Sequence, residues 1–83
     1  MRKLNWKIIE SNIREAREEL EELERTIAKT NKPAEVELQL SLRHAYHHLN
    51  CAWNIRHTET AKYRNMTEDD FKTWGKFPEG FDD

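Results

Sequence analysis

Apolar side chains recur every seven residues through the first third of the chain. The spacings alternate between three and four over three heptads, as they do when one side of an α-helix packs against another helix. Asn5 suits the N-cap position, so the pattern predicts a first helix over residues about 6–29. The members of the repeat are Trp6, Ile9, Ile13, Ala16, Leu20, Leu23 and Ile27.

Pro33 suits the first position of a second helix, because proline lacks the N–H that would have no partner there. From Pro33 to about Arg64 the chain contains no glycine and no further proline, which predicts one helix over residues about 33–64. The connection is short, so residues 1–66 are expected to form an antiparallel hairpin. The side predicted to pack on the first helix comprises Leu38, Leu42, Ala45, Leu49, Ala52, Trp53 and Arg56.

Residues 67–83 have a different character. Thr67 and Asp70 have the spacing of a capping box and Gly75 is a stop signal, which predicts a short helix over residues 68–74. We expect the aromatic tail of this segment to pack on the hairpin, with Phe81 looser at the end, although aromatic anchors would also suit a peptide that recruits a partner. The residues expected to pack are Phe71, Trp74 and Phe77.

Composition narrows the class of protein. A chain of 83 residues makes one small domain, and the core of such a domain rarely supplies more than about 3–5 kcal/mol, so a second copy is expected. The net charge of -2 is spread over interspersed residues of both signs, which argues against a nucleic-acid binder. No apolar run suits a signal peptide or a membrane span, so we expect a cytoplasmic location. The single cysteine, Cys51, excludes an internal disulfide and a four-cysteine zinc framework.

Residues 44–56 gather three of the four histidines, the cysteine and one of the three tryptophans. One stripe of this helix has no charge when its histidines are neutral, and we assign it to an interface between two copies. A second stripe carries amides and imidazoles where a solvated surface would favour Glu and Lys, so we expect it to face a partner. The interface stripe is Leu40, His44, His48, Cys51 and Ile55, and the polar stripe is Arg43, His47, Asn50, Asn54 and His57.

His44 and His48 are four residues apart, a spacing at which two imidazoles on a helix can bind one metal ion, and Cys51 could add a thiolate. No acidic residue lies between Glu37 and Glu59 to orient these side chains. We therefore expect no cofactor, with zinc or another transition metal as the alternative.

Arg56 falls on the predicted core side, where a cation needs a partner. Glu10 would come to a similar height in an antiparallel hairpin, and Trp6 could offer its ring to the guanidinium. These three residues predict a structural clasp, with an anion-binding role for Arg56 as the alternative.

Together these features predict an all-α protein in which an antiparallel two-helix hairpin plus a short C-terminal helix dimerises into a four-helix bundle. The leading function is a non-catalytic homodimeric interaction or scaffold module, and an unidentified protein partner is a further option. The alternative is a small metal- or ligand-binding enzyme, whose site would comprise His44, His47, His48, Asn50 and Cys51. Neither nucleic acid nor a membrane is expected as a partner.

Overall fold

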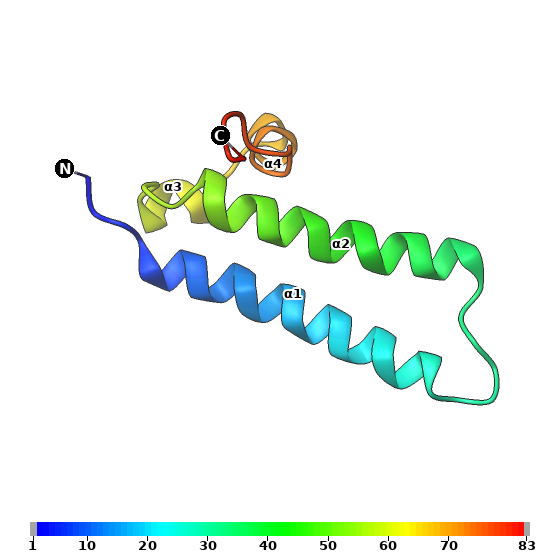
Figure 1. Cartoon of the computed structure of the whole chain (residues 1–83). Coiled ribbons are helices and arrows are strands. Elements are labelled where there is room, and N and C mark those ends of the chain that lie inside the picture. The colour runs from blue at the N-terminus through cyan, green and yellow to red at the C-terminus, as the bar shows by residue number, and fades with distance from the viewer. Residues whose placement is uncertain (1, 83) are drawn as a thin grey trace.

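The computed structural model describes residues 2–82, which form four helices (Figure 1). The all-α class predicted from the sequence is thus confirmed for this part of the chain. Figure 1 shows α1 and α2 side by side, running in opposite directions, with α4 against the C-terminal half of α2. None of the four helices is long and apolar enough to cross a lipid bilayer. The helices are α1 (Trp6–Ile27), α2 (Glu35–Asn54), α3 (Thr60–Arg64) and α4 (Glu68–Trp74).

The first helix begins where its cap is expected. The side-chain oxygen of Asn5 accepts a hydrogen bond from the backbone N–H of Ile8 at 3.3 Å. Helix α1 ends at Ile27 and α2 begins at Glu35, each within two residues of the predicted boundary, which is the ordinary variation at helix ends. The first residue after Pro33 is still extended, so the second helix starts later than that proline.

The second helix is shorter than predicted. It ends at Asn54, so the expectation of one helix over 33–64 was wrong. The backbone N–H of Asn5 donates to the carbonyl of Arg56 at 2.6 Å, and its side-chain amide donates to the carbonyl of Thr58 at 2.8 Å. Carbonyls freed at the end of a helix need donors. Because Asn5, at the start of α1, lies beside the end of α2 and supplies those donors, the helix ends here without a glycine or proline.

The side of α2 that packs against α1 also differs from the prediction. Cys51 and Ile55, which were assigned to a surface between copies, are buried within the chain, and Ile55 is 0% exposed. Most of the large side chains assigned to the core are exposed instead, namely Leu38, Leu42, Leu49 and Trp53. Both assignments were wrong, because α2 is rotated about its axis by roughly a quarter turn from the predicted orientation. The rotation brings His48 to Asn12, which α1 buries.

Helix α4 spans the predicted residues. The Thr67 hydroxyl accepts from the backbone N–H of Asp70, and the Asp70 carboxylate accepts from the backbone N–H of Thr67, both at 3.0 Å. Asp70 also pairs with Lys62 of α3 at 2.8 Å. Trp74 packs against the small apolar cluster that contains Ile55, and its ring stacks on Tyr63 at a centroid distance of 6.2 Å.

Replacement of Asn5 with Ala removes both the cap of α1 and the side-chain donor to Thr58. We expect the free energy of unfolding to fall by about 2 kcal/mol, since a cap and a net hydrogen bond each contribute about 1 kcal/mol. Asn5→Asp keeps the cap acceptor and loses the donor, so its stability should lie between the two. Urea denaturation followed by circular dichroism measures this, with the exposed Lys7→Ala as the control. Equal stabilities of Asn5→Ala and the unmodified protein would contradict the role of Asn5 at the break.

Candidate functional site

Two residues of the predicted polar stripe anchor α4. The Asn50 amide donates to the carbonyl of Gly75 at 2.8 Å, and the Asn54 amide donates to the carbonyls of Trp74 and Lys76 at 2.7 and 2.8 Å. These are carbonyls at the C-terminal end of a helix, which have no partner within that helix. The amides therefore contact the chain itself, which corrects the expectation that this stripe faces a partner.

The other members of the polar stripe are spread over different surroundings. His57 lies in the turn that follows α2, where its Nδ1 is 3.1 Å from the carbonyl oxygen of Lys3. Arg43 is exposed and lines a hollow of about 580 Å³ together with His47. The structure thus does not gather the stripe into one surface.

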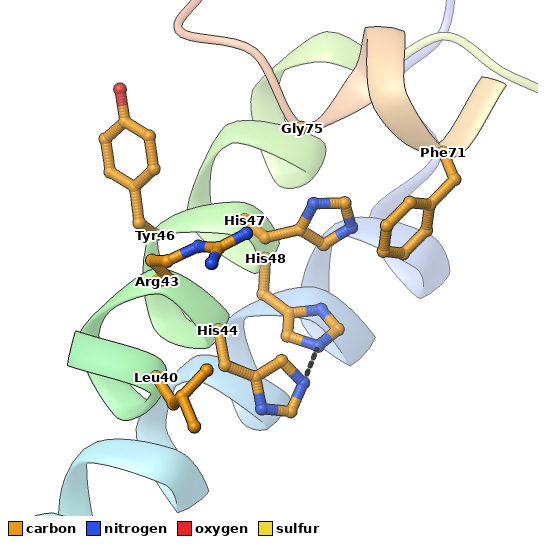
Figure 2. A pocket seen from close by; sticks show the side chains of 8 residues that line it. All are labelled: Leu40, Arg43, His44, Tyr46, His47, His48, Phe71 and Gly75. Atoms are coloured by element: carbon orange, nitrogen blue, oxygen red, sulfur yellow. Dashed lines mark hydrogen bonds between the residues drawn. The ribbon is translucent and has the colours of Figure 1, made fainter. Parts of the chain in front are cut away.

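His47 is held between α2 and α4 (Figure 2). Its ring lies 4.1 Å from the ring of Phe71, measured between centroids, and its Nε2 is 3.4 Å from the sulfur of Cys51. Burial lowers the pKa of His47, and the neighbouring His48 and His44 lower it further. The imidazole is therefore neutral at neutral pH and serves as part of the packing between the two helices.

Gly75 leaves room for this ring. A Cβ atom at position 75 would lie 2.7 Å from Cε1 of His47 and closer still to its Nδ1. The φ angle of Gly75 is -84°, so alanine would fit the backbone and clash only with the imidazole.

Gly75→Ala should lower the free energy of unfolding by about 1–3 kcal/mol, the usual cost of overpacking. Combining Gly75→Ala with His47→Ala removes the clash, so the double variant should be no less stable than His47→Ala alone. Denaturant unfolding of the three variants measures the coupling. Additive losses in the double variant would show that the clash is not the cause.

His44 and His48 lie at the edge of the layer formed by α1 and α2, and their Nε2 atoms are 3.2 Å apart (Figure 2). The Nδ1 atom of His48 is 2.8 Å from the side-chain oxygen of Asn12. The Nδ1 atom of His44 is 3.0 Å from a carboxylate oxygen of Glu19. A polar chain of four side chains therefore crosses between α1 and α2.

The surroundings of His48 lower its pKa. Burial lowers the pKa of His48 and His44 adds to the effect, while the carboxylates of Glu15 and Glu19 act in the opposite direction. Both carboxylates favour a positive charge at His48. Leu40, the remaining member of the predicted interface stripe, is exposed and lines the hollow beside His44.

The structure separates the three metal-ligand candidates. Cys51 contacts His47 and not the facing atoms of His44 and His48. Burial raises the pKa of the Cys51 thiol to about 11, which makes it a poor ligand and a poor nucleophile at neutral pH. Within residues 2–82, no three side chains of the metal-binding types form a group that could hold an ion.

Native Cys51 should react with iodoacetamide at neutral pH at least about a hundredfold more slowly than in urea-unfolded protein. The rise of its pKa from 9.0 to about 11 lowers the thiolate fraction by that factor, and burial adds to it. Mass spectrometry of timed samples measures the rate. Labelling of the native thiol at the unfolded rate would contradict its enclosure.

The predicted clasp does not form. Glu10 pairs with Arg14, one turn along α1, at 2.5 Å. The guanidinium of Arg56 lies over the ring of Trp53, 3.8 Å from its centroid, and donates to the Trp53 carbonyl at 2.8 Å. The pairing of Glu10 with Arg56 was therefore wrong. Trp6 lines an apolar hollow of about 300 Å³ beside Arg56.

Three residues of this region were not singled out from the sequence: Asn12, Glu19 and Gly75. Asn12 carried a signal, because it is the only amide in a helix that is otherwise rich in Glu and Arg. Nothing in the sequence distinguishes Glu19 from the other glutamates of α1, and Gly75 was interpreted only as a helix stop.

Comparisons with protein-family models, with curated proteins and with solved structures found no match to this chain.

Proposed function

We propose that this protein is a non-catalytic homodimeric scaffold, in which the α1–α2 layers of two copies pack together as a four-helix bundle. The observation that supports it is a set of large apolar side chains that α1 and α2 leave exposed, called here the apolar face. It consists of Trp6, Ile13, Leu20, Leu42, Leu49 and Trp53.

The apolar face draws on both long helices. Spacings of seven residues align its α1 members along one side of that helix, and Ile13, Leu49 and Trp53 line the same apolar hollow. Trp6 is 67% exposed and Leu49 is 50% exposed. Contiguous apolar surface of this kind marks an interaction site on most proteins.

The exposed area supports a partner of substantial size. The chain exposes 6708 Å², which is about 1,500 Å² more than the roughly 5,200 Å² that a monomer of its 10.0 kDa mass ordinarily exposes. Obligate dimers bury about 1,000–2,500 Å² on each copy. The radius of gyration is 14.6 Å, against about 12 Å for a compact domain of this length. A second α1–α2 layer packed on the first would cover the excess exposed area and make the assembly more compact than one chain alone.

A second copy suits the apolar face better than a strongly acidic or strongly basic partner does. A two-fold dimer uses the same patch on both copies, so the charges that flank the patch must not repel their own kind. Residues of both signs are interspersed on the exposed sides of α1, where Glu10 pairs with Arg14 and Arg17 with Glu21. The interface proposed now replaces the stripe assigned from the sequence, and the cytoplasmic location expected from the sequence is kept as part of the proposal.

Leu49→Glu should dissociate the dimer while leaving the helices intact, because Leu49 is exposed within one chain. Burying an unpaired carboxylate costs several kcal/mol, so the dissociation constant should rise at least about a hundredfold. The unmodified protein should have twice the chain mass of 10.0 kDa in sedimentation equilibrium at micromolar concentration.

Leu40→Glu is the matched control, since Leu40 lies on the same helix, is 56% exposed and points away from the apolar face. It should remain dimeric. A monomeric unmodified protein would refute the proposal. Dissociation by Leu40→Glu and not by Leu49→Glu would return the interface to the histidine side.

A further inference from the structure

The Nε2 atoms of His44 and His48 lie 3.2 Å apart, which is hydrogen-bonding distance (Figure 2). A neutral imidazole carries one hydrogen, on either Nδ1 or Nε2, and the other nitrogen carries a lone pair. The hydrogen-bond partners of the two Nδ1 atoms decide where each hydrogen lies.

Asn12 fixes the hydrogen of His48. The Asn12 amide nitrogen donates to the carbonyl of Ile8 at 3.0 Å and to the hydroxyl of Tyr63 at 3.4 Å. Its side-chain oxygen is left to accept from Nδ1 of His48 at 2.8 Å. Asn12 is only 1% exposed, so its orientation is set by these protein partners. His48 therefore carries its hydrogen on Nδ1 and a lone pair on Nε2.

Glu19 fixes the hydrogen of His44 in the same way. An ionised carboxylate can only accept hydrogen bonds, and an oxygen of Glu19 lies 3.0 Å from Nδ1 of His44. The side chain of Glu19 is only 28% exposed, so its carboxylate is held against the protein, where it orients the ring of His44. With a hydrogen on each Nδ1, an Nε2 atom can hydrogen-bond to the other only if it gains a proton, and a metal ion bound by both Nε2 lone pairs is the alternative to that proton.

We propose that His44 and His48 bind one divalent transition metal ion, of the zinc type, through their Nε2 atoms. Bonds of about 2.0–2.1 Å to a tetrahedral ion place two nitrogen ligands roughly 3.3 Å apart, close to the 3.2 Å observed. Imidazole pairs at i and i+4 on a helix are a recurring way to hold zinc. The inference does not depend on dimerisation, because both ligands belong to one chain.

Glu19 and Asn12 are positioning residues in this site. Ligating histidines usually donate their other N–H to a carboxylate or an amide or carbonyl oxygen, which orients the ring and strengthens it as a ligand. Both histidines already have such an acceptor. The sequence contains no acidic residue near the pair on α2, so the carboxylate comes from α1.

Two protein ligands leave two positions of a tetrahedral ion for water or for a ligand from another molecule. These positions open on the hollow of about 580 Å³ beside the pair. Arg43 also lines this hollow and its positive charge disfavours a bound cation, while the carboxylates of Glu15 and Glu19 near His48 favour one. His47 is excluded from the ligand set, because its ring is held by Phe71 and Cys51.

The first test is a calorimetric titration of the untagged protein with Zn²⁺. We expect one ion per chain. His44→Ala, which changes an exposed side chain, should weaken binding by at least about a hundredfold, and Glu19→Gln by about ten- to a hundredfold, the usual effect of removing an orienting partner. His57→Ala is the matched control, since His57 lies in the turn after α2 and contacts Lys3. This variant should bind Zn²⁺ as tightly as the unmodified protein does.

The second test is NMR of the imidazole nitrogens, with circular dichroism to show that each variant is folded. Zn²⁺ should shift the Nε2 resonances of both His44 and His48, while their Nδ1 hydrogens stay in place. Two outcomes would overturn the proposal: a proton shared between the Nε2 atoms that Zn²⁺ does not displace, or undiminished Zn²⁺ binding by a folded His44→Ala variant.

Discussion

The rotation of α2 depends on one buried amide. Asn12 of α1 bonds to His48 of α2 and to Tyr63 of α3, so a single side chain joins three helices. An amide inside a protein costs free energy unless its groups are hydrogen-bonded, and these contacts require His48 to turn toward α1. The large apolar residues of α2 then turn away from α1. They form the apolar face together with the apolar residues that α1 also leaves uncovered.

Hydrogen bonds between polar groups that would otherwise lack partners also hold α4 in place. Asn50 and Asn54 bind the carbonyls where α4 ends, and Gly75 allows that end to approach the ring of His47. The amides of α2 would otherwise need water or a partner, and the carbonyls of α4 would need donors. Each set satisfies the other, so a short helix with few buried side chains of its own is held in a defined position.

The two sides of the α1–α2 layer consequently have different chemistry. One side is apolar and largely exposed, with Phe81 of the tail lying against Trp53, which suits association with another copy of the layer. The other side carries His44 and His48 with the orienting carboxylate of Glu19, beside an open hollow. Association and cation binding would therefore occupy opposite sides, and neither would block the other.

Local interactions made part of the structure predictable from the sequence. The all-α class, the cap at Asn5 and the bounds of α4 depend on residues within a few positions of one another. The end of α2 and its rotation depend on contacts between Asn5 and Thr58, 53 positions apart, and between Asn12 and His48, 36 positions apart. An apolar pattern shows which side chains avoid water, but it does not show which neighbour covers them. In this protein hydrogen bonds between distant polar residues accompany that choice, because Asn12 and His48 provide partners for each other between α1 and α2, where an unpaired polar group would cost free energy.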